Sequence, residues 1–230
     1  MNQATASAVG MMLAVTVVLA GCSKAGKTEA DKTQAALGDA IVVDPTMTAE
    51  SGAAGAEKGI VLSPDSRSSQ AIEATRKAAA DLAGGLRELP EPVKGSASQL
   101  SAVAAAAAQT TPAAKAAKTD CTTKVQYGPD WAQKLPAELP LYPRAAVQEA
   151  AGTDSDGCAL RVVSFGTPVA QQDVIGFYRA MALKAGYSAD YRLDGGDQVV
   201  GGGKGGQAYV VFARKQSNGV TEVDLITSGR

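Results

Sequence analysis

Residues 167–186 have the sequence TPVAQQDVIGFYRAMALKAG, whose apolar side chains recur at the three- and four-residue spacing of a helix. We expect Thr167 at the N-cap, Pro168 in the first turn and Gly186 just past the last turn. One face of this helix carries six apolar residues: Ala170, Val174, Phe177, Tyr178, Met181 and Ala185. Such a face is stable only when it packs on another layer of structure, so the helix predicts a partner surface.

The segments on both sides of the helix predict that partner surface. Residues 145–150 and 159–165 are strand candidates, joined by the polar sequence GTDSDG that is typical of a hairpin turn. After the helix come three or four further strand candidates with glycine-rich or Asn-Gly turns between them: residues 187–193, 198–201, 207–214 and 220–227. The sequence therefore predicts an α+β fold, in which one helix packs on an antiparallel sheet of about five strands.

The aromatic residues mark the expected domain boundary. All of them lie between Tyr127 and Phe212, whereas residues 23–118 contain none. A segment rich in Ala, Gly, Ser and Thr buries too little apolar surface to offset the entropy of ordering it. We therefore expect residues 22–118 to form a largely disordered, Ala-rich tether and residues 119–230 to form the compact domain.

Three parts of the tether have features of their own. Residues 68–89 have the spacing of an isolated helix that ends before Pro90. Residues 100–109 are almost pure alanine and favour a transient helix without a face wide enough to dock. The aliphatic cluster DAIVVDP, residues 39–45, is interpreted as part of the linker rather than as a strand that binds a partner.

The amino-terminal segment has the pattern of a secretion signal. Residues 8–20 are apolar except for Thr16, and this run is too short to span a bilayer. The run ends in Leu19-Ala20-Gly21-Cys22, an arrangement that resembles the type II signal peptide of bacterial lipoproteins. The resemblance implies that residues 1–21 are removed, that the Cys22 thiol carries a diacylglycerol and that the new amino terminus is acylated. The alternatives are an uncleaved anchor helix and a chance apolar stretch with a buried cysteine.

Lipid on Cys22 is expected to anchor the mature chain, because two or more acyl chains give stable membrane binding. The residue after Cys22 is Ser23. In the lipoproteins that this segment resembles, an Asp at that position often retains the protein at the inner membrane. We therefore expect an outer-membrane lipoprotein that faces the periplasm, with the inner membrane as the alternative.

The carboxy-terminal half also resembles a known kind of module. The similarity is carried by Trp131, the PLYPRA sequence of residues 140–145, the Phe177-Tyr178 pair and the AGY sequence of residues 185–187. Over residues 127–227 these features resemble a small α+β module of uncharacterised envelope lipoproteins from Gram-negative bacteria. The resemblance implies the same fold and location, and it carries over no catalytic residue.

Two cysteines remain once Cys22 is assigned to lipid. In the oxidising periplasm, an even remainder predicts a disulfide between Cys121 and Cys158. A zinc site is disfavoured because the chain has no histidine and no C-x-x-C spacing. A free reactive thiol is the remaining alternative.

Composition argues against most classes of enzyme. The chain has 22 basic and 23 acidic residues, so no charge excess favours nucleic acid. It has no histidine, which removes the commonest general acid or base and the commonest metal ligand. We expect a binding or scaffolding module without catalytic residues, cofactor or metal, whose partner is another envelope protein or a glycan. The alternative is a carboxylate-dependent hydrolase of an envelope glycan, for which these acids are available: Asp154, Asp156, Asp194, Asp197, Glu222 and Asp224.

Several other motifs are assigned to structure rather than to chemistry. The GGGKGG sequence of residues 201–206 precedes a strand candidate, so a hairpin turn is favoured over a phosphate-binding loop. The DSDG sequence, residues 154–157, lacks the flanking acids that a calcium loop needs. The rings of Phe177, Tyr178 and Tyr187 are expected in the core. Trp131 is expected to plug the sheet edge rather than to form an exposed anchor.

Overall fold

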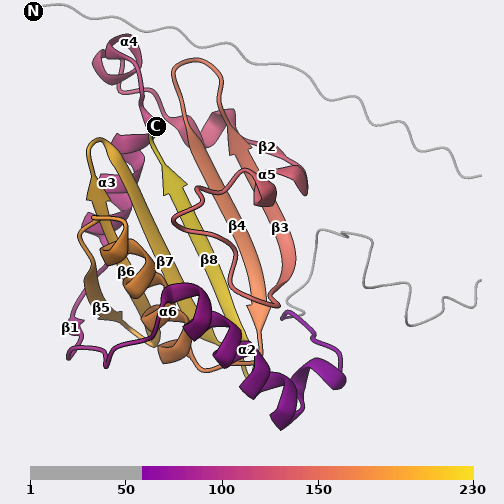
Figure 1. Ribbon diagram of the computed structural model, residues 1–230. Coiled ribbons are helices and arrows are strands. Elements are labelled where there is room, and N and C mark those ends of the chain that lie inside the picture. The colour runs from indigo at the N-terminus through magenta and orange to yellow at the C-terminus, as the bar shows by residue number, and fades with distance from the viewer. Residues whose placement is uncertain (1–58) are drawn as a thin grey trace, which may run out of the picture. The chain divides into compact units, whose positions relative to one another are not determined.

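An eight-stranded mixed sheet forms the centre of the structure, a computed structural model that describes residues 59–230 (Figure 1). The strand order is β1-β5-β6-β7-β8-β4-β3-β2. Only β1 and β5 pair in parallel, and all other neighbouring strands are antiparallel. The strands are β1 Val93–Lys94, β2 Gln126–Tyr127, β3 Ala146–Thr153, β4 Leu160–Thr167, β5 Asp190–Asp194, β6 Asp197–Lys204, β7 Gln207–Lys215 and β8 Thr221–Ser228.

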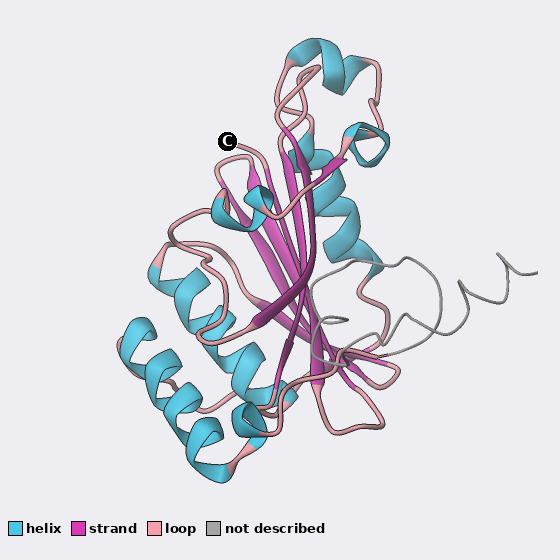
Figure 2. Ribbon diagram, turned by 90° about the vertical axis from the view of Figure 1, so that its right-hand side faces the viewer, coloured by secondary structure: helices cyan, strands magenta, loops and turns pink. Residues whose placement is uncertain are grey.

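Helices lie on both sides of this sheet, which is seen nearly edge-on in Figure 2. The α-helices are α2 Ser69–Ala83, α3 Ser98–Ala108, α4 Pro112–Ala116, α5 Asp130–Gln133 and α6 Gln171–Lys184, with short 3-10 turns η2 Asp65–Arg67 and η3 Cys121–Lys124. The predicted α+β class is confirmed. The predicted arrangement of one helix on about five antiparallel strands is coarser than the observed one, in which eight strands form a mixed sheet with helices on both sides. None of the helices in the described range is both long and apolar enough to cross a membrane.

Helix α6 is the predicted amphipathic helix, but it begins later than the sequence suggests. Thr167 is the last residue of β4, where it pairs with Thr221 of β8. The helix instead begins after Ala170, whose N–H donates to the Asp173 carboxylate at 3.2 Å. The sheet ladder therefore takes precedence over the Thr-Pro signal that predicted a cap at Thr167.

Aromatic side chains fill the face of the sheet under α6. Phe177 and Tyr178 are fully buried, and each meets its neighbour edge to face: Phe177 with Tyr142 at 5.1 Å and with Tyr178 at 5.0 Å between ring centroids. The Tyr178 hydroxyl donates to the Pro140 carbonyl at 3.1 Å, which satisfies its polar end inside the core. Helix α2 packs beside α6 and adds Ala79 and Ala83 to the same cluster (Figure 1).

Helix α3 covers the opposite face of β6, β7 and β8, which corrects the expectation that it cannot dock. Its stripe of Leu100, Ala104 and Ala108 is buried. A Cβ on Gly201 of β6 would lie only 3.3 Å from Leu100 Cδ1, so the glycine leaves the space that the helix occupies. Small side chains on both partners therefore allow a close approach that needs no wide apolar face.

The compact unit thus begins well before residue 119, and the prediction of a disordered tether is wrong for residues 59–118. Ile60 and Leu62 are buried against Val220, the residue directly before β8. The Asn218 side chain donates to the Ile60 carbonyl at 2.9 Å, which fixes this end of the chain on the β7–β8 turn. Residues 1–58 lie outside the described residues, and with them Cys22 and the aliphatic segment 39–45.

Candidate binding groove

A groove of about 440 Å³ lies beside α2 and α6, where α2 ends and the chain turns toward β1. Its volume is in the range of small-molecule sites. Helix α2 ends at Gly84, whose φ of 78° is the left-handed conformation that favours glycine at a helix C-terminus. The lining comes from both helices and from the loop between α2 and β1: Ala83, Gly84, Gly85, Arg87, Leu89, Gly176, Arg179, Ala180, Leu183 and Lys184.

Three cations line the groove and no acid does. Arg87, Arg179 and Lys184 form no ion pair with any carboxylate of residues 59–230. The Nε atom of Arg179 is buried and has no hydrogen-bond partner there. Like charges held near one another without counter-charges give the groove a positive potential that attracts anions.

Gly176 gives the groove its depth. It lies in the interior of α6, where glycine is less favourable than alanine by about 0.5–1 kcal/mol. A Cβ built on Gly176 would have no atom within 4 Å apart from its own helix. Close packing is therefore not the reason for a glycine at this position. Since Gly176 lines the groove, a larger residue there would project into the open space.

Gly84, at the end of α2, leaves space for a side chain on the other wall of the groove. A Cβ on Gly84 would lie 3.7 Å from Lys184 Nζ, so the ammonium group of α6 rests against the bare backbone at the end of α2. This contact brings the Lys184 charge across to the loop that also carries Arg87. The two helices therefore hold their cations around one space rather than on separate surfaces.

A second cavity, of about 50 Å³, is too small for an organic ligand. It lies among β4, β7 and β8, and Tyr187, Gln207 and Thr227 are among the residues that line it. The Tyr187 hydroxyl donates to the Gln207 amide oxygen at 3.0 Å. We interpret this cavity as a packing feature of the sheet.

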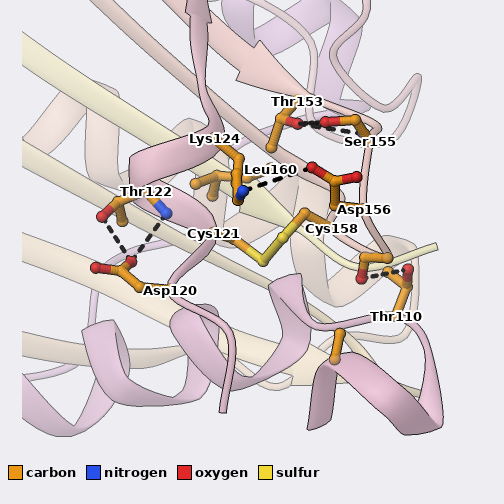
Figure 3. The surroundings of a disulfide bond; sticks show 12 residues. Thr110, Asp120, Cys121, Thr122, Lys124, Thr153, Ser155, Asp156, Cys158 and Leu160 are labelled. Carbon is orange, nitrogen blue, oxygen red and sulfur yellow. Dashed lines mark hydrogen bonds and ion pairs between the residues drawn. A yellow bond between two sulfur atoms is a disulfide. The ribbon is translucent and has the colours of Figure 1, made fainter. Parts of the chain in front are cut away.

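The predicted disulfide between Cys121 and Cys158 is present and buried (Figure 3). Their Cα atoms are 5.6 Å apart, and the bond joins η3 to the β3–β4 hairpin turn. The hairpin is also bound to the segment after α3, because the Thr110 N–H donates to the Gly157 carbonyl at 2.7 Å. The bond therefore fixes the end of the α3 layer to the sheet.

The surroundings of the disulfide are polar and structural. Asp120 caps η3 by accepting hydrogen bonds from the Thr122 hydroxyl at 2.6 Å and the Thr122 N–H at 2.9 Å (Figure 3). These hydrogen bonds lower the pKa of the Asp120 carboxyl. Lys124 and Asp156 form an ion pair at 3.6 Å across the turn. In the part of the chain that the structure describes, no three His, Cys, Asp or Glu side chains come close enough to hold a metal ion.

The six acids considered for hydrolysis do not converge on either cavity. Each has a structural partner elsewhere in the domain, and Asp197 and Glu222 share Arg214. The pairs are Asp154 with Arg161, Asp156 with Lys124, Asp194 with the Ala97 N–H, Asp197 with Arg214, Glu222 with Arg214 and Gln216, and Asp224 with the Ser164 hydroxyl. The geometry therefore brings no pair of these carboxylates to the groove.

The remaining motifs lie where the sequence suggests, except that the turn predicted over residues 201–206 is confined to residues 205–206. Phe177, Tyr178 and Tyr187 belong to the core. Trp131 is half-buried against β3, and a Cβ on Gly152 would lie 2.6 Å from its ring, so the indole covers the strand directly. The glycines of residues 201–203 lie within β6, and the following turn leads into β7 rather than into a helix.

The groove is not predicted from the sequence, because its two walls come from segments that the sequence assigns to different parts of the molecule. Arg179 lies on the helix that the sequence placed in the domain, whereas Arg87 lies in the segment that it placed in the tether. Gly176 was the available signal, since a glycine inside an otherwise amphipathic helix usually has a packing or functional reason. No family model, curated protein or solved structure matches this chain.

Proposed function

We propose that the protein is a lipid-anchored envelope protein whose folded domain binds an anionic ligand in the groove between α2 and α6. The observation that carries the proposal is the set of three cations, Arg87, Arg179 and Lys184, around one space that no carboxylate lines. Cations with no counter-charge repel one another and gain most from an anion that all of them contact. Arginine is suited to this task because its planar fork of N–H groups matches carboxylate and phosphate oxygens.

The proposed location rests on the sequence pattern around Cys22. Residues 23–58 separate that cysteine from the first described residue, Gly59. We propose that lipid on Cys22 holds the domain at the outer membrane, facing the periplasm. In this setting the groove takes its ligand from the envelope, and no step of catalysis is needed.

Ligand binding is tested with an anionic fluorescent probe, 8-anilinonaphthalene-1-sulfonate, titrated into the full chain. Arg179→Gln and Arg87→Gln are each expected to weaken binding about ten-fold, the loss of one charge-assisted contact. Lys94→Gln is the matched control, because Lys94 is an exposed cation of β1 outside the groove. Equal affinity in the wild type, the two arginine variants and the control would refute the proposed site.

Anchoring is tested by labelling cells with radioactive palmitate. The Cys22→Ser chain is expected to take up no label and to remain uncut. Label that persists in this variant would contradict lipidation at Cys22 and leave the groove unaffected.

A further inference from the structure

Exposed leucines on or next to the segments that form the cationic groove narrow the class of ligand that fits it. Three leucines of residues 59–230 are more than a third exposed, and all lie at this end of the helical layer: Leu82, Leu86 and Leu183, with exposures of 46%, 37% and 46%. Leu183 lines the groove together with the half-buried Leu89. Exposed apolar side chains that cluster in this way mark a contact surface, whereas single ones need no explanation.

Two leucines are each followed directly by a cation at the groove. Leu86 precedes Arg87 in the loop, and Leu183 precedes Lys184 near the end of α6. A small soluble anion would gain nothing from the leucines, and a neutral acyl chain would gain nothing from the cations. Only a ligand with both an anionic group and a hydrocarbon chain uses the whole lining.

We infer that the ligand is an acyl chain that carries a phosphate, of the acylglycerol phosphate class. This inference rests on the proposed function, which it deepens from any anion to an amphiphilic one. Phosphate is favoured as the anionic group because it offers several oxygens to two guanidinium groups and one ammonium group at once. The acyl chain lies against Leu89 and Leu183 and over the alanines of the groove, which removes apolar surface from water.

A substitution at Gly176 can test ligand binding without disturbing the fold. In the interior of α6, leucine is a better helix former than glycine, and the added side chain has open space to enter. Gly176→Leu is therefore expected to stay folded while its side chain occupies the groove. Gly176→Ala is the matched control, since a single methyl group takes little of a volume of about 440 Å³.

The test compares one ligand with its two halves by titration calorimetry, below the micelle concentration. The ligand is 1-acylglycerol 3-phosphate, and its halves are glycerol 3-phosphate and the monoacylglycerol. The full chain carries Cys22→Ser, so that its own acyl chains do not compete for the groove. The intact ligand is expected to bind at least about ten-fold more tightly than either half. Gly176→Leu is expected to lose at least about ten-fold in affinity, with the far-ultraviolet circular dichroism unchanged.

Each other outcome overturns a defined claim. If glycerol 3-phosphate binds as tightly as the acylated compound and depends on Arg179, the inference fails while the proposed anion site stands. If the monoacylglycerol binds as tightly, or if no compound binds, the inference and the proposed function both fail. Full affinity in a folded Gly176→Leu protein would overturn the placement of the acyl chain in this groove.

Discussion

The two faces of the sheet are closed in opposite ways. Under α6, large aromatic rings such as Tyr142, Phe177 and Tyr178 fill the space between helix and sheet. Under α3, alanines line the buried stripe of the helix, Leu100 lies against Gly201 of β6, and a disulfide holds the end of that layer. One face is filled by aromatic rings, and the other is closed by a near approach of helix and sheet that small residues allow. A helix can therefore dock with only one large buried side chain of its own, Leu100, because alanine and glycine let it approach the sheet closely.

The largest effect is expected when the second layer is removed altogether. A chain of residues 120–230 loses α2 and α3, and it exposes Val199 and Val210, which are both fully buried. We expect this fragment to unfold without cooperativity or to aggregate, whereas residues 59–230 unfold in a single transition. Urea unfolding followed by circular dichroism measures the difference. Cooperative unfolding of the shorter fragment with equal stability would show that the α3 face contributes little.

Limited proteolysis gives an independent check of the same boundary. Lys115 and Lys118 are exposed at α4, so trypsin can cut there only if this short helical segment, anchored by the buried Ala114, unfolds locally. We expect these sites to be protected in the folded protein and to become labile after the disulfide is reduced. Rapid cleavage at both sites in the oxidised protein would contradict the docking of α4 through Ala114.

Alkaline pH is expected to act on the aromatic face alone. Burial raises the pKa values of the Tyr142, Tyr178 and Tyr209 hydroxyls well above the usual value of about 10. The unfolded chain then releases protons first, so stability is complete below pH of about 10 and is lost as the pH rises through the folded values. Each buried tyrosine contributes a slope of up to about 1.4 kcal/mol per pH unit. Ionisation at 295 nm should therefore coincide with unfolding, and gradual ionisation in a folded protein would refute the burial of these hydroxyls.

Reduction of the disulfide is the matching perturbation of the α3 face. The bond spans a separation of 37 residues, for which the chain-entropy estimate is about 4 kcal/mol. Replacement of both Cys121 and Cys158 by serine should lower the free energy of unfolding by about that amount. Hydrogen exchange should rise first in α3 and in the segment up to η3, while α6 stays protected. A uniform loss of protection over both faces would argue that the two layers do not open separately.

The sequence predicted the aromatic face better than the alanine face for a physical reason. The helix of residues 171–184 and the strands around it carry large apolar side chains at regular spacing, and that signal is local. Docking of α3 depends on the contact between Leu100 and Gly201, which are far apart in the sequence. Neither residue alone predicts that contact. Glycines that predicted a turn thus belong to a strand that needs them for close approach. A composition argument that counts large side chains cannot detect such a contact.

The candidate site was unpredictable for a related reason. The disulfide followed from counting cysteines, and its residues were identified correctly. The groove instead requires that α2 packs on α6, because only this contact brings Arg87 close to Arg179 and Gly176. A helix assigned to a disordered tether has no such partner, so nothing in the sequence places Arg87 beside α6.

The smallest effect on stability is expected from one methyl group added to the sheet under α3. This substitution tests the close approach of α3 to the sheet most directly. A Cβ on Gly201 would lie 2.9 Å from the Tyr209 carbonyl oxygen and 3.3 Å from Leu100 Cδ1, so the neighbouring strand or α3 must move. Gly201→Ala is expected to cost about 1–3 kcal/mol, the usual range for an overpacked core. Gly196→Ala is the control, because a Cβ there meets no atom within 4 Å and its φ is not positive, and it should change stability by less than about 0.5 kcal/mol. Equal stability of the two variants in urea unfolding would mean that α3 does not rest on the glycines of β6.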